Sequence, residues 1–305
     1  MLKERYINPF TDFGFKKIFG EESNKDILID FLNNLLKGKE QIKDLRFKNT
    51  EKLGNSQVDR RAIFDLYCEN EKGEQFIIEL QKSKQQFFKE RSLYYSTFPI
   101  QEQAEKGEWN FKLKAVYLVA IVDFVFEEDK DSKECYHEIK LLNTQTYKVF
   151  TDKLSFIYLE MPKFNKQENE LESQFDKWLY VLKFLPDLQD RPKILREKIF
   201  KKLFDIAELA NMPRSDYQKY ENSLKYYRDL KNVVDTAREE GREEGREEGI
   251  IKGREEGIIK GREEGREEGT KQSLKEVARN LKKVGLAAKD ISKVTGIPIE
   301  SIEEL

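Results

Sequence analysis

Two carboxylates in neighbouring apolar segments are the residues of this chain best suited to chemistry. Asp65 follows an Ala-Ile-Phe run, and Glu79 follows a Phe-Ile-Ile run, with Gln81 two residues further on. Such β-branched and aromatic runs favour strands, and the polar residues 69–74 between them have the composition of a turn. An ionised carboxylate in a buried strand is costly unless a cation or a hydrogen-bond donor compensates it.

A hairpin over the two segments brings these acids together. In the register that its turn implies, Asp65 lies directly opposite Glu79. Tyr67 then lies opposite Ile77. Side chains alternate with period two, so Asp65, Glu79 and Gln81 share one face. Opposed Cβ atoms lie about 4.5–5.5 Å apart, which lets two carboxylates hold one hard cation such as Mg²⁺ or Mn²⁺. The alternative is a solvated strand face on which the acids are incidental.

The composition removes several classes of mechanism. His137 is the only histidine among 305 residues, so a histidine-rich zinc site or a Ser-His-Asp relay lacks its material. We expect His137 to be a strand or loop residue. The net charge is −2, so any contact with nucleic acid must come from a local cluster of Lys and Arg. If the protein is an enzyme, carboxylates and a metal perform its chemistry.

Compartment is indicated by the cysteines and by the apolar segments. Cys68 and Cys135 have no disulfide-framework spacing, which indicates a reducing environment. The N-terminus lacks the apolar region of a signal peptide, and the longest apolar run, residues 115–122, is too short to cross a bilayer. We expect a cytoplasmic protein with no membrane partner.

The elements before the hairpin follow from their periodicity. Thr11 and Asp12 predict a capped turn or short helix, with Asp12 at the N-cap or in contact with substrate. Apolar residues at helical spacing predict a helix over residues 24–36. Residues 45–47 predict a first strand, which leads through residues 53–55 into the hairpin.

After the hairpin the period changes to 3.6 and predicts a helix that runs to about Pro99. Its apolar stripe comprises Phe87, Phe88, Tyr94, Tyr95 and Phe98. Arg91 falls on this stripe and either extends its charge to solvent or points at a carboxylate or phosphate near the hairpin. Lys82, Lys84 and Lys89 form the nearest basic cluster, as substrate contacts or as ordinary solvated charges.

These residues resemble the PD-(D/E)xK nuclease superfamily, and within it the bacterial branch of recombination-promoting nucleases and transposase-like proteins. The resemblance rests on Asp65 with Glu79-Leu-Gln, on residues 8–19 (Asn-Pro-Phe-Thr-Asp-Phe-Gly-Phe-Lys-Lys-Ile-Phe), on residues 91–95 (Arg-Ser-Leu-Tyr-Tyr), and on a glycine-spaced charged repeat near the C-terminus. It covers most of the chain. One departure is that Gln81 occupies the position of the catalytic lysine.

The resemblance implies an α/β (α+β) fold with a restriction-endonuclease-like mixed sheet flanked by helices. It implies a metal-dependent DNA endonuclease, linked to recombination or transposition, with DNA as its partner. Asp65 and Glu79 hold Mg²⁺ or Mn²⁺ in this interpretation, and Gln81 completes the catalytic set by positioning water.

Substrate contacts in the same interpretation come from Arg91, Lys82, Lys84 and Asp12. A different class of function is a weak or inactive nuclease-like module that binds DNA or a protein partner, and Gln81 keeps this alternative open. A transposase with three acids on a ribonuclease H-like sheet lacks a clear third acid at the right spacing.

The rest of the chain divides by composition. A near-continuous apolar run, residues 114–126, predicts the middle strand of the sheet, and weaker strands are expected at about 137–143 and 154–161. We predict a nuclease-like domain (1–165), a helical subdomain (166–236), a repeat (237–270) and a small helical pair (271–305).

Glycine recurs at every fourth position, eight times, between residues 238 and 269. Each glycine costs a helix interior about 1 kcal/mol relative to alanine, and the Arg and Glu between them exclude a membrane helix. The segment is therefore either a solvated helix that makes a homo-oligomer by self-association along the glycine row, or a disordered arm. The tail, residues 273–305, resembles a helix-turn-helix fragment without its third helix.

Overall fold

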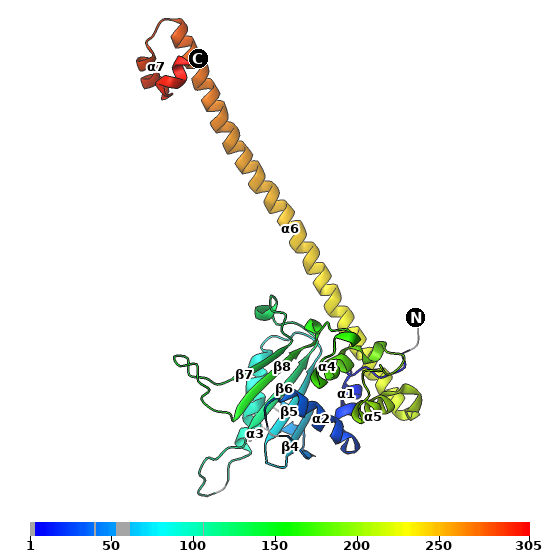
Figure 1. Ribbon diagram of the computed structural model, residues 1–305. Helices are drawn as coiled ribbons and strands as arrows, with labels where there is room; N and C mark the ends of the chain where they lie inside the picture. The colour runs from blue at the N-terminus through cyan, green and yellow to red at the C-terminus, as the bar shows by residue number, and fades with distance from the viewer. Residues whose placement is uncertain (1–3, 40, 53–61, 106) are drawn as a thin grey trace. The chain divides into compact units, whose positions relative to one another are not determined.

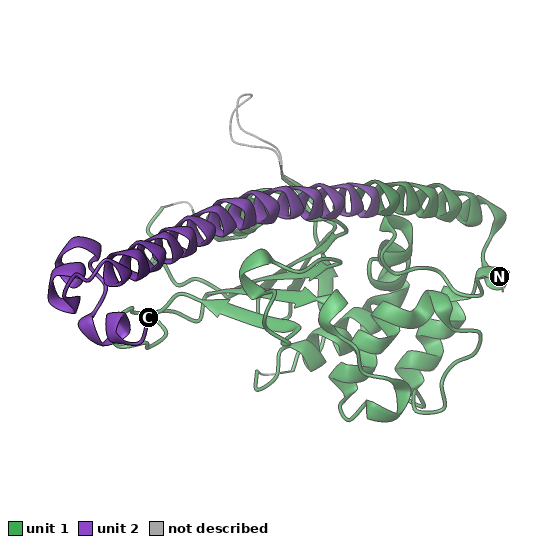
Figure 2. Cartoon of the chain, turned by 90° about the horizontal axis from the view of Figure 1, so that it is seen from above, with its two compact units in different colours: residues 1–234 green, residues 235–305 purple. Residues whose placement is uncertain are grey.

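The computed structural model describes residues 4–39, 41–52, 62–105 and 107–305 (Figure 1). Residues 53–55, expected to lead into the hairpin, lie outside the described residues. The chain forms two compact units, residues 1–234 and 235–305 (Figure 2). The finer division into four parts stays a prediction.

A mixed six-stranded sheet with the order β1-β4-β5-β6-β8-β7 lies at the centre of the first unit. The strands are β1 (Leu45–Phe47), β4 (Leu66–Asn70), β5 (Gln75–Gln81), β6 (Val116–Val122), β7 (Tyr136–Lys140) and β8 (Leu154–Glu160). Strands β5, β6 and β8 run parallel, and the other neighbours are antiparallel. Every residue of β6 is buried, which confirms the predicted middle strand. The predicted α/β fold with a mixed sheet is confirmed.

Helices cover both faces of this sheet. They are α1 (Asp12–Phe19), α2 (Lys25–Leu35), α3 (Phe88–Gln101), α4 (Gln174–Phe184) and α5 (Lys198–Ala207). The larger apolar core joins α1, α2, α4 and α5 to one face of the sheet, including Phe76 and Ile78. The smaller core joins α3 to the other face, including Ile77. Because side chains alternate, Glu79 and Gln81 lie on the α3 face with Ile77.

Strands β4 and β5 form the predicted hairpin, with Tyr67 opposite Ile77 as expected. The first strand, however, is broken before Leu66. Residues Ala62–Ile63 (β3) pair instead with Glu51–Lys52 (β2) in a separate two-stranded sheet. The prediction of one continuous strand is wrong, because the Asp65 side chain bonds a backbone amide of β5 and so competes with regular strand pairing.

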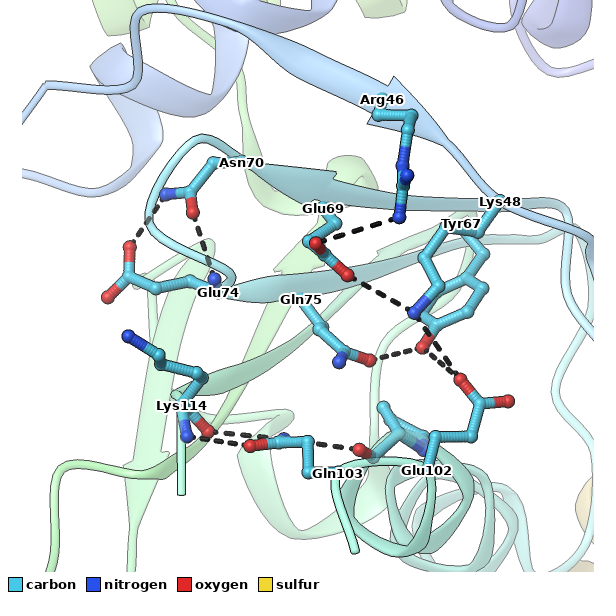
Figure 3. Close-up of polar contacts among 11 residues, drawn as sticks. Arg46, Lys48, Tyr67, Glu69, Asn70, Glu74, Gln75, Glu102, Gln103 and Lys114 are labelled. Carbon is cyan, nitrogen blue, oxygen red and sulfur yellow. Dashed lines mark hydrogen bonds and ion pairs between the residues drawn. The ribbon is translucent and has the colours of Figure 1, made fainter. Parts of the chain in front are cut away.

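Figure 3 shows the polar network that fixes the C-terminal end of α3 to the hairpin. The Tyr67 hydroxyl contacts the Gln75 side chain and lies 2.9 Å from Glu102 Oε2. Lys48 Nζ lies 3.3 Å from Glu69 Oε2 and 3.4 Å from Glu102 Oε2. Burial, followed by the Glu102 hydrogen bond, raises the pKa of Tyr67, so its hydroxyl stays protonated. With this end anchored, the first turn of α3 lies over the opposite end of β5.

The buried face of α3 is narrower than the sequence predicts. The buried residues are Phe88, Ser92, Ser96 and Pro99. Phe87 and Tyr94 are 64% and 42% exposed, so their assignment to the stripe is wrong. At 100° per residue Tyr94 lies about 120° around the helix from Phe88, whereas Tyr95 lies only about 20° away. Phe87 precedes the helix and has a left-handed backbone (φ 61°), which directs it away from that stripe.

The repeat is helical. Helix α6 runs without interruption from Arg214 to Lys283 and is followed by α7 (Ala288–Thr295) and α8 (Ile299–Glu303). Ala278 of α6 packs with Ile291 and Ile302 in a small core. The end of α6 thus supplies the third helix that the sequence was expected to lack, because helix continues through the repeat. No helix among the described residues is long and apolar enough to cross a membrane.

Candidate active site

The carboxyl edge of the parallel strands gathers most of the predicted residues. Glu79 and Gln81 lie in the last three residues of β5. Asp65 lies directly before the neighbouring strand β4. Asp123 follows β6 directly, and its amide donates to the Gln81 carbonyl at 2.9 Å. Glu160 ends β8. Sequence reasoning missed Asp123, although an acid directly after the strongest strand marks this edge.

Asp65 and Glu79 are joined through backbone amides. The Asp65 amide donates to Glu79 Oε1 at 3.3 Å, and the Leu80 amide donates to Asp65 Oδ2 at 2.7 Å. The structure therefore brings the two predicted acids together. Among the described residues, no donor contacts Asp65 Oδ1 or Glu79 Oε2, so each carboxylate retains one oxygen for a further ligand.

The electrostatics of this pair favour a bound cation. Glu79 is 7% exposed, and burial, followed by the charge of Asp65, raises its pKa to about 8. Burial also raises the pKa of Asp65. Neither carboxylate forms an ion pair with a Lys or Arg of the described residues. A buried and a half-buried carboxylate, each with one oxygen that no described donor contacts, are a donor set that suits a hard divalent cation.

Gln81 is held by Arg91. Arg91 Nη2 donates to Gln81 Oε1 at 2.6 Å, and Gln81 Nε2 donates to the Ser83 carbonyl at 2.9 Å. The guanidinium of Arg91 also contacts the Gln85 side chain. Arg91 therefore points toward the hairpin, and its positive charge lowers the pKa of Glu79, against the larger effect of burial.

The two predicted lysines lie in different surroundings. Lys84 is exposed and lies 3.5 Å from Glu127. Lys82 makes no ion pair with a described residue, and its Nζ lies 5.6 Å from the ring centroid of Tyr226. Burial lowers the pKa of Lys82, while the charges of Asp12 and Asp65 act in the opposite sense. Of these two lysines, Lys82 is therefore the one whose charge interacts with Asp12 and Asp65.

Asp12 is the first residue of α1 and not its cap. The cap is Thr11, whose extended backbone (φ −87°, ψ 148°) lets its hydroxyl accept from the Gly14 amide. The prediction of Asp12 as N-cap is wrong by one position. Asp12 instead lies 3.0 Å from Lys16, within the electrostatic reach of Asp65.

A second acidic cluster lies at the same sheet edge and was missed by sequence reasoning. Ligand atoms of Asp129, His137 and Glu160 lie within 4.8 Å of one another. The Phe126 amide donates to Glu160 Oε1 at 2.6 Å, His137 Nε2 lies 3.0 Å from Oε2, and Lys163 also contacts Oε2. The Lys163 ammonium already provides a cation, so this cluster suits a metal less well. His137 lies in β7, as expected of a strand residue.

A mixed six-stranded sheet with flanking helices and two acids on one hairpin is consistent with the PD-(D/E)XK nuclease fold. The family model of the PD-(D/E)XK nuclease family transposases matches residues 9–237, and the chain belongs to this family. The glycine repeat lies outside the matched residues. Neither a curated protein nor a solved structure matches the chain.

Proposed function

We propose that this protein is a metal-dependent DNA endonuclease that hydrolyses phosphodiester bonds in DNA recombination or transposition. The observation that carries the proposal is the pair of Asp65, which is half-buried, and Glu79, which is buried, because neither forms an ion pair with a Lys or Arg in the part of the chain that the structure describes. Membership of a nuclease family makes DNA the expected substrate. The two cysteines are free thiols, which is consistent with a reducing, cytoplasmic location.

Asp65 and Glu79 would hold Mg²⁺ or Mn²⁺ through the oxygens that the backbone amides leave unused. The ion supplies Lewis acidity at the scissile phosphate and lowers the pKa of a bound water. The protein contributes the fixed position of the two acids, because each is hydrogen-bonded to the other's strand. Such preorganisation removes reorganisation from the reaction step.

Gln81 occupies the position of the catalytic lysine, and Gln81 and Arg91 together perform the roles of that lysine. The Gln81 amide retains one N–H and one lone pair beyond its contacts with Ser83 and Arg91, and these orient the attacking water. The Arg91 guanidinium retains unused donors for a phosphate oxygen. Lys82 is the second proposed phosphate contact.

Lys84 and Asp12 complete the proposed substrate surface. Lys84 reaches DNA by exchanging its exposed partner Glu127, which costs little because such surface pairs contribute about 0–1 kcal/mol. Asp12, exposed beside Lys16, contacts the substrate from α1.

A weak or inactive nuclease-like module is the second candidate function. The specific observation in its favour is that Gln81 replaces the lysine and that both ends of its amide already have protein partners. Such a module would bind DNA or a protein without cutting.

We also propose that residues 238–269 associate with a second copy of the chain. A Cβ added to any of the eight glycines would meet no atom within 4 Å. The row therefore has room for close approach by another helix, while Arg and Glu pair outside it.

Cleavage of supercoiled plasmid with Mg²⁺, Mn²⁺ or EDTA tests the enzymatic proposal. We expect metal-dependent nicking by the full-length protein and its loss in Asp65→Ala and Glu79→Ala. Asp152→Ala, an exposed acid before the opposite end of β8, is the matched control and should cut normally. Activity that persists in EDTA or in both active-site variants excludes the proposal. Metal-independent DNA binding without cleavage would instead establish the second candidate.

A further inference from the structure

Strand β7 is the last strand of the six-stranded sheet, so one of its edges has no partner strand among the described residues. Its inward backbone bonds are Glu160 N–H to Cys135 O, Phe150 N–H to Leu141 O, and Asn143 N–H to Lys148 O. On the β7 side, each of these three bonds uses a backbone group of an odd-numbered residue, namely Cys135, Leu141 or Asn143. Backbone groups alternate in direction along a strand, so the amides of Tyr136, Glu138, Lys140 and Leu142 face the open edge.

The strand continues into a hairpin arm, residues 141–150, that projects beyond the sheet (Figure 1). The large apolar residues of the arm and of the adjoining end of β7 are all exposed: Ile139, Leu141, Leu142 and Val149 by 43–49%, and Tyr147 and Phe150 by 80% and 81%. The arm is internally bonded, since Leu142 bridges Val149 and the Asn143 side chain accepts two amides of the turn. A segment that is held by its own hydrogen bonds and exposes this much apolar surface is typical of a protein interface.

We propose that β7 pairs antiparallel with β7 of a second copy of this chain, about a two-fold axis at Ile139. The charged residues of the strand indicate that the partner at this open edge is a second copy of the chain. Around this axis Glu138 lies opposite Lys140 of the second copy, and Lys140 lies opposite its Glu138. Directly opposed residues share a face, so both cross-chain pairs are attractive. The register also pairs the residues whose amides face outward, as a continuous antiparallel ladder requires.

The same register covers the apolar residues. Ile139 lies opposite Ile139 of the second copy. On the same α3 face, Leu141 of each copy lies next to Ile139 of its own chain, so these residues form one apolar cluster across the axis. On the other face Leu142 of the second copy lies opposite Tyr136. Beside Tyr136 is a cavity whose apolar lining comprises Val125, Cys135, Pro162, Phe164 and Phe175. The arm of the second copy enters along this cavity, where its exposed rings find apolar contacts.

This surface is separate from both proposals made above. The arm joins the amino end of β8, whereas Glu79 lies at the carboxyl end of β5, with seven residues in each strand. The glycine repeat belongs to the other compact unit. Loss of β7 pairing therefore leaves metal-dependent cleavage and any association of the repeat in place.

A charge exchange in trans tests the pairing by sedimentation velocity of the full-length protein. Glu138→Lys leaves only lysines at positions 138 and 140, and Lys140→Glu leaves only glutamates. Each variant alone should associate roughly ten-fold more weakly or worse, because like charges then face each other. An equimolar mixture should associate as the wild type does. Glu105→Lys, an exposed residue outside the arm with the same change of charge, should have no effect.

The mixture separates cross-chain pairing from a local effect. Glu138 and Lys140 lie 3.0 Å apart within one chain, and a defect that arises from this pair is not rescued by mixing. Unrescued loss, or sedimentation unchanged in both variants, overturns the proposal. It is also overturned if Lys140→Glu weakens DNA binding while sedimentation is unaffected, which would make the arm a nucleic-acid contact. Unchanged thermal unfolding shows that each variant is folded.

Discussion

Two acidic clusters at one edge of the sheet differ in where their positive charge comes from. Glu160 is fully buried and is contacted by His137, by Lys163 and by a backbone amide. Asp65 and Glu79 receive backbone amides only and make no ion pair with a described residue. The first cluster includes the Lys163 ammonium, whereas the described residues place no such cation beside Asp65 and Glu79, where we propose that a metal ion binds.

Under the proposed function, this difference separates a structural cluster from a catalytic one. A buried charge that is paired within the chain stabilises the fold only when both partners are present. A pair of acids that repel each other costs stability in the free protein, and that cost falls when a cation binds. The open pair is therefore the part of this edge that can couple stability to ligand binding.

The largest effect should be on cleavage. Glu79→Ala or Asp65→Ala should lower the cleavage rate by about 10³-fold or more, because the ion loses half of its protein ligands. Glu160→Gln, at the structural cluster, should retain cleavage in the fraction that folds. Initial rates of plasmid nicking, normalised to folded protein, measure the contrast. Equal losses at the two clusters would remove the distinction.

Stability should respond in the opposite order. Glu160→Ala leaves Lys163, 7% exposed, without its carboxylate and should destabilise the fold by about 3–5 kcal/mol. Glu79→Gln replaces the acid by a side chain that stays neutral at every pH, and in EDTA it should leave stability unchanged below about pH 4.5 and be increasingly stabilising from there to about pH 8. Urea unfolding in EDTA measures both changes. If Glu79→Gln is the more destabilising, the acids at the open pair are structural.

The pH dependence sharpens the same comparison. The pKa of Glu79 is raised to about 8 from its ordinary 4.5, so the metal-free native state holds a proton that the unfolded state has lost. Stability in EDTA should therefore fall as the pH rises from about 4.5 to about 8. Mg²⁺ should raise the melting temperature more above pH 8 than below pH 5, and Glu79→Gln should flatten both trends. Calorimetric scans across this range are the measurement.

Arg91 should matter more for cleavage than Lys84. Its guanidinium contacts Gln81 at 2.6 Å, whereas Lys84 is exposed beside Glu127. Arg91→Ala should lower cleavage about ten-fold and reduce the slope of log affinity against log salt by about 0.9, the share of one phosphate contact. Equal effects of Arg91→Ala and Lys84→Ala would make Arg91 an ordinary surface charge.

The smallest effect on chemistry should come from the repeat. Deletion of residues 238–269 should lower the oligomeric order and leave metal-dependent cleavage in place, because the family match ends at residue 237. Sedimentation of full-length and shortened protein gives the answer. The same oligomeric order in both would leave the repeat as a spacer with no role in assembly.

Several features of the fold were predictable because they depend on residues close together in the sequence. The register that places Tyr67 opposite Ile77 follows from the turn between two short apolar runs. The burial of β6 follows from its unbroken apolar run. The helix over residues 25–35 follows from apolar spacing alone. In each case the period of the side chains identifies the element.

The sequence by itself determined the hairpin, its register and the two acids, since these depend on local period and turn chemistry. Only the tertiary structure decided which acids lie beside a basic side chain. Glu160 meets His137 from the adjacent strand and Lys163 from the next turn, and no period in the sequence marks these three as one cluster. The open edge of β7 is likewise a property of strand order. A strand whose sequence predicts one buried face can lie inside a sheet or at its margin. Strand order depends on contacts between distant segments, which local side-chain patterns do not encode.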